Sequence, residues 1–216
     1  MRGRGETEAP PPVGQMAGHV PVEHGPLLTV FTGPAGSGKS SVALAFARRH
    51  GAVYLDKDSL AGGFVGELLR VAGIAPDARD ENEYYGQRVM GLEYDALLSV
   101  AGDNMRIGRH VVLDAPFARY LGDASFLESM SLKRGWPAGL RVIVVQVSVP
   151  SGLRRERLRQ RGLDRDTWKL ENWEQHESSA PGECAWSGAH VVTFDNSGPT
   201  VDVAPLDAAL SVSEVA

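Results

Sequence analysis

Cysteine is nearly absent from this sequence. The chain of 216 residues contains a single cysteine, Cys184, which excludes an intramolecular disulfide and any metal site built from several thiolates. The fold must therefore depend on the burial of apolar side chains, and so few cysteines are typical of a cytoplasmic protein. Hydrophobic residues make up 43% of the chain and charged residues 23%, a composition that predicts a globular protein with a packed core.

Long hydrophobic runs are also lacking. The longest apolar stretch covers residues 142–149, far short of the roughly 20 residues that cross a bilayer, so no membrane span is predicted. Residues 1–26 are rich in proline, glycine and charge and have no apolar segment typical of a secretion signal. We expect them to form a flexible leader, and we expect residues 198–216 to form a tail or a short helix.

Lysine is scarce, and basic charge is in the minority. Only four of the 22 basic residues are lysines, and the formal net charge is −5. This balance disfavours broad electrostatic binding of nucleic acid, because such binding requires an extended positive surface. A small-molecule partner is therefore favoured over a nucleic acid.

Short apolar runs alternate with helical patterns along the chain. Strands are predicted at 27–32, 52–55, 110–113, 141–149 and 190–194, and helices at 40–50, 60–71 and 81–101. This alternation indicates an α/β protein whose five strands form a doubly wound parallel sheet, with ligands at the carboxyl ends of the strands. Residues 27–197 are predicted to form this domain, and residues 59–109 a helical insertion within it.

A phosphate-binding motif connects the first predicted strand to the first predicted helix. It reads Gly33-Pro34-Ala35-Gly36-Ser37-Gly38-Lys39-Ser40 and matches G-x-x-x-x-G-K-[ST] at every fixed position. The glycines allow successive backbone N–H groups to converge on phosphate oxygens at a helix N-terminus. Lys39 is expected to reach the β- and γ-phosphates, Ser40 to bind Mg²⁺, and Ser41 to contact the α-phosphate. The predicted ligand is ATP or GTP with Mg²⁺.

Carboxylates follow two of the other predicted strands. Asp58 lies just after the second strand, where it would face the γ-phosphate and accept the proton of an acceptor hydroxyl. Asp56 is the alternative candidate, and either aspartate could instead cap a helix. Asp114 ends the third strand and is a candidate to orient Mg²⁺ or its waters, although it too could be a cap.

Six arginines fall within twelve residues after the fourth strand. They are Arg154, Arg155, Arg157, Arg159, Arg161 and Arg165. On a helix, several of them would form one stripe of like charge, which an anion could neutralise, and Arg157 with Arg161 could clamp the β- and γ-phosphates. The alternative is a solvated face paired with nearby acidic residues. Gly162 could act as a hinge, which makes residues 150–180 a candidate lid.

Together, these residues resemble the small phosphate-loop kinases. That group includes the 5′-kinase domain of polynucleotide kinases, chloramphenicol phosphotransferase and zeta-type toxins, and the resemblance covers residues 27–197. It implies an adenylate-kinase-like sheet with the strand order 2-3-1-4-5. It also implies that Asp58 activates the acceptor and that Arg157 and Arg161 are lid arginines.

The same resemblance implies where the two substrates bind. Such kinases build the acceptor pocket from the helical insertion, which makes Tyr84 and Arg88 candidate acceptor residues, although an ordinary amphipathic helix would look the same. Asp195 and Asn196 follow the fifth strand, where related kinases hold the nucleobase. Arg119 corresponds to an arginine that holds the acceptor phosphate in nucleoside monophosphate kinases, but the segment from Asp114 is one residue longer here.

The sequence therefore predicts a Mg²⁺-dependent kinase that transfers the γ-phosphoryl group to a hydroxyl of a small molecule such as an antibiotic, nucleoside or sugar. Two alternatives remain at this stage. One is a polynucleotide 5′-hydroxyl kinase, and the other is a nucleotide-binding regulator without transferase activity. The oligomeric state is left open.

Overall fold

The computed structural model describes residues 25–76, 79, 82–178 and 182–208. Almost all of the predicted leader, and residues 209–216 of the predicted tail, lie outside these residues. The elements are β1 (Leu27–Thr32), α1 (Lys39–His50), β2 (Val53–Asp56), α2 (Lys57–Val71), η2 (Tyr85–Val89), α3 (Met90–Arg106), β3 (Val111–Asp114), α4 (Phe126–Arg134), β4 (Arg141–Ser148), α5 (Ser151–Arg161), η3 (Asp164–Asp166), α6 (Thr167–Glu171), α7 (Trp173–Ser178), β5 (Ala189–Asp195) and η4 (Ala204–Leu206).

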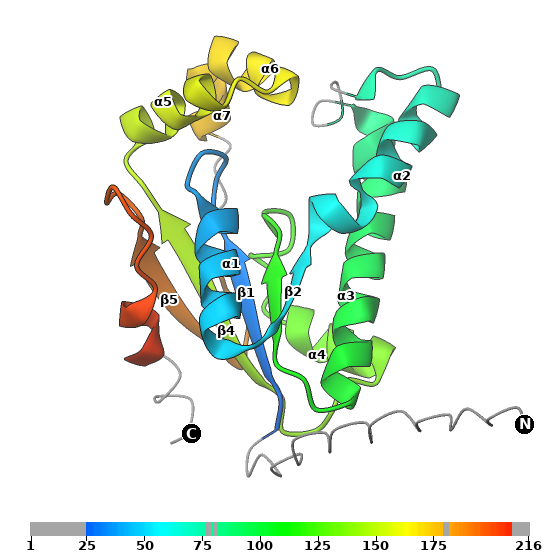
Figure 1. The fold of residues 1–216 in the computed structure, drawn as a ribbon. Coiled ribbons are helices and arrows are strands. Elements are labelled where there is room, and N and C mark those ends of the chain that lie inside the picture. The colour runs from blue at the N-terminus through cyan, green and yellow to red at the C-terminus, as the bar shows by residue number, and fades with distance from the viewer. Residues whose placement is uncertain (1–24, 77–78, 80–81, 179–181, 209–216) are drawn as a thin grey trace, which may run out of the picture.

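The five strands form one parallel sheet with the order β2-β3-β1-β4-β5 (Figure 1). Both the predicted fold class and the strand order implied by the resemblance are thereby confirmed. Strand β1 lies at the centre and all six of its residues are buried, which explains its nearly continuous apolar sequence. Because the strands are parallel, their carboxyl ends meet at one edge of the sheet.

Helices cover both faces of the sheet (Figure 1). Leu28 and Val30 of β1 pack into a core with residues of α3 and α4. Leu27 and Phe31 point to the opposite face and pack with residues of α1 and η4. This alternation follows from the two-residue period of a strand, so one strand supplies both hydrophobic cores.

The helical insertion between β2 and β3 consists of α2, η2 and α3. The two predicted helices are confirmed, but α2 begins earlier than predicted and α3 extends to Arg106. Leu69 of α2 is buried in a small core with Tyr85 and Val89 of η2. None of the helices in the described part of the chain has the length and apolarity that crossing a bilayer requires.

At the amino-terminal edge of the sheet, His110 is held in its neutral form. Its Nδ1 atom accepts a hydrogen bond of 3.0 Å from the backbone N–H of Leu27. Burial lowers the pKa of His110 below its ordinary value, and the charges of Arg141 and His50 lower it further. A proton on Nδ1 would remove the acceptor of this hydrogen bond.

We expect this histidine to make folding stability depend on pH. The pKa of His110 is lower in the folded chain than in the unfolded chain, where it is about 6.5. Its contribution is therefore complete above that value and is lost as the pH falls toward the folded pKa. In His110→Asn, whose side-chain oxygen can still accept from Leu27, melting temperatures between pH 7.5 and 5.5 should fall less steeply than in the wild type. The same dependence of melting temperature on pH in the two proteins would contradict the assignment of this effect to His110.

Candidate active site

The phosphate loop (P-loop, residues 33–40) links β1 to α1 at the carboxyl edge of the sheet. A Cβ atom at Gly33 would lie 2.6 Å from the carbonyl oxygen of Val147, so the backbone approach requires glycine there. Gly38, with φ of 79°, is the N-cap of α1 and provides no side-chain cap. The N–H groups at the start of α1 thus receive no side-chain cap from this residue, which favours an anion at this position.

Lys39, the lysine of the P-loop, forms an ion pair with Asp114 at the end of β3. The other carboxylate oxygen of Asp114 accepts a hydrogen bond of 2.8 Å from the hydroxyl of Tyr54. Burial and the charge of Asp114 raise the pKa of Tyr54, so this hydroxyl stays protonated and acts as a donor. Asp114 is 0% exposed, and Lys39 and Tyr54 are its neutralising and hydrogen-bonding partners.

The residues predicted to bind Mg²⁺ are suited to an ion that binds together with a nucleotide. Ser40 and Ser41 are exposed in the first turn of α1, and Asp114 ends β3. The described residues include no group of three or more acidic, histidine or cysteine side chains that could hold a metal by itself. Mg²⁺ is usually bound by one or two protein groups together with phosphate oxygens and water. A hydroxyl and one strand-end carboxylate fit that mode.

The structure separates the roles of Asp56 and Asp58. Asp56 is the N-cap of α2, and its side chain accepts a hydrogen bond of 2.6 Å from the backbone N–H of Ser59. It therefore has the capping role considered for it. Asp58 lies in the first turn of α2 and forms ion pairs of 3.0 Å with Lys57 and 3.2 Å with Arg79.

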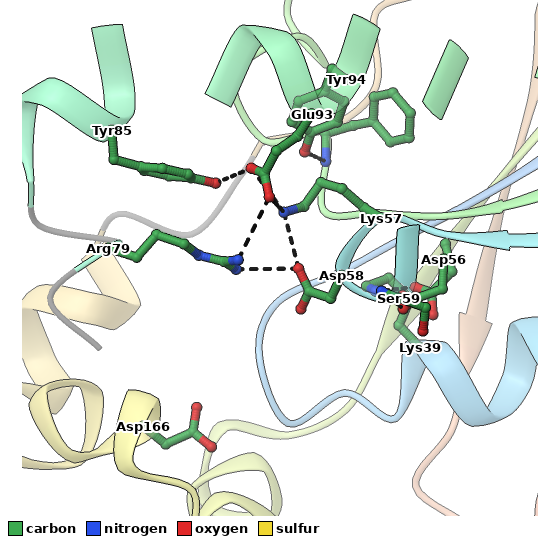
Figure 2. A network of polar contacts seen from close by, with 12 residues as sticks. Lys39, Asp56, Lys57, Asp58, Ser59, Arg79, Tyr85, Glu93, Tyr94 and Asp166 are labelled. Atoms are coloured by element: carbon green, nitrogen blue, oxygen red, sulfur yellow. Dashed lines mark hydrogen bonds and ion pairs between the residues drawn. The ribbon is translucent and has the colours of Figure 1, made fainter. Parts of the chain in front are cut away.

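Asp58 belongs to a larger polar network (Figure 2). Lys57 contacts both carboxylate oxygens of Glu93 at 3.2 Å, and Arg79 approaches the same carboxylate at 3.6 Å. The hydroxyl of Tyr85 also donates to Glu93. That Lys57 and Arg79 belong to the site was not predicted from the sequence. The position of Lys57 between two aspartates at the end of a strand was a signal that could have indicated it.

The strand register places these groups along one edge. Asp56 pairs in register with Asp114, and Asp114 pairs with Phe31, two residues before the P-loop. Strand β3 alone therefore separates the strand that leads to Asp58 from the strand that leads to the P-loop. This edge brings the predicted carboxylates and the P-loop to the same end of the sheet.

Of the two predicted lid arginines, Arg157 contacts the P-loop. Its guanidinium donates to the carbonyl oxygen of Asn196 at 2.9 Å and to that of Ser37 at 3.4 Å. Arg161 instead donates to the carboxylate of Asp166 at 2.8 Å through Nε and at 2.5 Å through Nη2. The structure thus brings Arg157, but not Arg161, into contact with the P-loop.

Two arginines of the predicted stripe, Arg154 and Arg161, are paired with carboxylates of the protein. Arg154 is buried, forms an ion pair with Glu177 of α7, and lies over the ring of Trp173 at 5.6 Å. Arg161 is paired with Asp166, as described above. The alternative prediction, that the arginines pair with nearby acidic residues, therefore applies to Arg161. The acidic partner of Arg154, Glu177, lies farther along the chain.

Asn196 and Asp195 occupy different environments after β5. The buried side chain of Asn196 donates a hydrogen bond of 2.9 Å to the carbonyl oxygen of Ser37. Asp195 is exposed and accepts a hydrogen bond of 3.0 Å from the backbone N–H of Ser197. Asn196 thus supports the P-loop backbone, a contact that the sequence did not predict.

The residues predicted to bind the acceptor differ in their exposure from their neighbour in the insertion. Tyr84 and Arg88 are exposed, whereas the neighbouring Tyr85 is buried and joins the network around Asp58. Arg119, in the loop after β3, donates a hydrogen bond of 2.7 Å to the carbonyl oxygen of Gly86. This contact ties that loop to η2.

The parallel sheet with the order 2-3-1-4-5 and the P-loop between β1 and α1 define the fold of the P-loop kinases. Residues 28–180 match the family described as the AAA domain. Because this match spans more than half of the chain, the chain belongs to that family. Among curated proteins, no match was found.

Solved structures with the same fold include three kinases or candidate kinases. A candidate kinase from Chloroflexus aurantiacus is 16% identical with a TM-score of 0.63, and the match covers 88% of this chain and 99% of that protein. A sugar kinase from Janibacter is 14% identical with a TM-score of 0.56, covering 89% and 96%. A gluconokinase from Sinorhizobium meliloti is 18% identical with a TM-score of 0.50, covering 88% and 94%. At these identities the similarity establishes the fold.

Proposed function

We propose that this protein transfers the γ-phosphoryl group of ATP or GTP to a hydroxyl of a small molecule. The observation that carries the proposal is the position of Asp58 in the first turn of α2. It follows β2 at the same sheet edge that carries the P-loop and Asp114. A carboxylate at the same sheet edge as a triphosphate site suits phosphoryl transfer to an alcohol, because it can accept the proton of the hydroxyl.

The P-loop would bind the triphosphate through its backbone N–H groups, and Ser41 would contact the α-phosphate. Lys39 would move from Asp114 to the β- and γ-phosphates. Ser40 and Asp114 would hold Mg²⁺ directly or through its waters, and the bound ion would neutralise charge on the phosphate oxygens.

Asp58 would accept the proton of the acceptor hydroxyl as the hydroxyl oxygen attacks the γ-phosphorus in line with the departing nucleoside diphosphate. The new O–P bond forms as the bond to the diphosphate breaks, with no covalent enzyme intermediate. Arg157 and Arg161 would stabilise the charge on the transferring group, Arg161 after exchanging Asp166 for phosphate oxygens.

The remaining predicted residues would define the two binding sites. Tyr84, Arg88 and Arg119 would contribute to the acceptor site from the insertion and the loop after β3. Asp195 and Asn196 would lie at the nucleobase. The hydrogen bond from Asn196 to the carbonyl oxygen of Ser37 would then link the nucleobase site to the P-loop backbone.

The direct test is a transfer assay. The protein is incubated with Mg²⁺, ATP or GTP, and a panel of hydroxylated compounds, together with a 5′-hydroxyl oligonucleotide. Mass spectrometry should detect a phosphate ester on at least one small molecule and none on the oligonucleotide. Tight nucleotide binding without modification of any acceptor would contradict the proposal and favour a nucleotide-binding regulator.

A further inference from the structure

The network around Asp58 contains two acidic and two basic side chains in mutual contact (Figure 2). Lys57 lies 3.0 Å from Asp58 and 3.2 Å from Glu93, and Arg79 lies 3.2 Å from Asp58 and 3.6 Å from Glu93. Each cation is thus shared by both carboxylates. Among the described residues, each charged side chain of this network has a partner of opposite charge, so a ligand meets neither an unpaired cation nor an unpaired anion there.

Burial increases from Asp58 toward the interior. The side chain of Asp58 is 36% exposed and that of Arg79 is 19% exposed, whereas Lys57 is 5% and Glu93 is 1% exposed. The buried rings of Tyr85 and Tyr94 lie beside the cations, at 5.4 Å from Arg79 and 6.0 Å from Lys57. A ligand therefore meets Asp58 first, and Glu93 stays out of contact with water.

These contacts penalise a charged acceptor of either sign. An anionic acceptor would compete with Glu93 for the positive charge of Arg79 and Lys57 and would weaken the charge compensation of that buried carboxylate. A cationic acceptor would be attracted to Asp58 but would lie against the two cations already there. For an anion the penalty falls on the buried charge of Glu93, and for a cation it comes mainly from Lys57, which is almost fully buried and therefore weakly screened by solvent.

An uncharged hydroxyl group meets no such penalty. An ammonium has three N–H donors and a guanidinium has five, so Lys57 and Arg79 can donate to hydroxyl oxygens while they keep their carboxylate partners. Asp58 can accept from the hydroxyl that is to be phosphorylated. Several hydroxyls on one molecule would use several of these groups at once.

We propose that the acceptor is an uncharged polyhydroxylated compound, such as a sugar or polyol, selected by the Lys57–Asp58–Arg79–Glu93 network. This inference rests on the proposed function, since it names the substrate class of that site. It makes Glu93 a specificity-determining residue, because its buried charge sets how strongly the two cations attract an anion.

Calorimetric binding to the full chain, saturated with a non-hydrolysable ATP analogue and Mg²⁺, tests this inference. The probes are matched compounds that differ in charge: the ring compounds glucose and glucosamine, and the open-chain pairs sorbitol with gluconate and xylitol with xylonate. The wild type should bind the neutral members at least about tenfold more tightly than the charged ones. Because the readout is binding, its outcome is independent of whether transfer occurs.

Two variants should shift the preference in opposite directions. Glu93→Gln removes the buried negative charge and should shift the ratio by about tenfold toward the carboxylates. Arg79 lies on the more exposed side of the network, so its substitution is less of a risk to folding. Arg79→Gln should shift the binding ratio toward glucosamine. The control, Arg70→Gln, changes an exposed arginine of α2 and should leave the ratio unchanged.

The proposal is overturned if the wild type binds gluconate more tightly than sorbitol or glucosamine more tightly than glucose, or if no neutral probe binds. It is also overturned if Arg79→Gln and Glu93→Gln both retain the preference of the wild type. A preference for gluconate that disappears in Arg79→Gln would identify an anionic acceptor instead.

Discussion

Asp58→Asn is expected to reduce phosphoryl transfer by about 10²- to 10⁴-fold, the usual contribution of a general base, while nucleotide affinity stays at the wild-type value. An amide can still accept a hydrogen bond from Lys57 or Arg79 but cannot take the acceptor's proton. Turnover should be measured in the transfer assay and affinity by titration with a fluorescent nucleotide.

Asp56→Asn provides the matched control, since it is the same substitution two residues away. Asparagine caps helices as well as aspartate does, so α2 keeps its start and transfer should remain close to that of the wild type. Loss of transfer in Asp56→Asn together with normal turnover in Asp58→Asn would show that Asp56, and not Asp58, is the general base.

Lys39→Met is expected to impair both nucleotide binding and folding stability. Affinity for Mg²⁺-bound ATP should fall by about 10- to 100-fold, because charge-assisted hydrogen bonds contribute about 1.5–3 kcal/mol. The free energy of unfolding should fall by about 3–5 kcal/mol, because the fully buried Asp114 loses its counter-charge. Nucleotide titration and urea denaturation measure the two effects.

The double variant Lys39→Met/Asp114→Asn separates these effects. It removes both charges and keeps an oxygen that can accept from Tyr54, so most of the lost stability should return while nucleotide affinity stays low. Equal stability of the wild type and Lys39→Met would argue against the ion pair with Asp114. Normal nucleotide affinity in either variant would exclude Lys39 as a phosphate ligand.

The sequence predicted the central features of the fold because they depend on local patterns. The apolar run of β1 and the eight consecutive P-loop residues specify a buried strand and a phosphate-binding turn without reference to distant parts of the chain. The strand order came from the resemblance, since alternation alone does not determine which strands are neighbours. Helix α4 was not assigned, because its nine residues carry a weak apolar pattern.

The polar network around Asp58 could not be predicted in the same way. Glu93 lies 36 residues from Lys57, and no spacing rule connects residues that meet through the packing of two helices. Its contact with Tyr85 also depends on the π-helical turn η2. In a regular α-helix, two residues eight positions apart differ by about 80° around the axis, and the wider turn reduces that difference.

The acidic partners of the arginines could be predicted only in part, for a related reason. Arg154 is paired with Glu177, 23 residues away in α7, and this contact depends on how the chain turns back after η3. Arg161 and Asp166 are only five residues apart, so their closeness along the chain was enough to suggest this pair. Local spacing thus identified one acidic partner, and the other required the fold.

The backbone contact between the P-loop and α5 limits how the lid segment could move. A Cβ atom at Gly36 would lie 2.7 Å from the carbonyl oxygen of Arg154 and 3.1 Å from the side chain of Leu158, which is itself fully buried. The first two turns of α5 are therefore a fixed support pressed against the nucleotide-binding turn. Arg157 and Arg161 lie on α5 before Gly162, so a pivot at Gly162 would move only the segment beyond it. These two arginines would therefore reach a bound triphosphate by movement of their side chains.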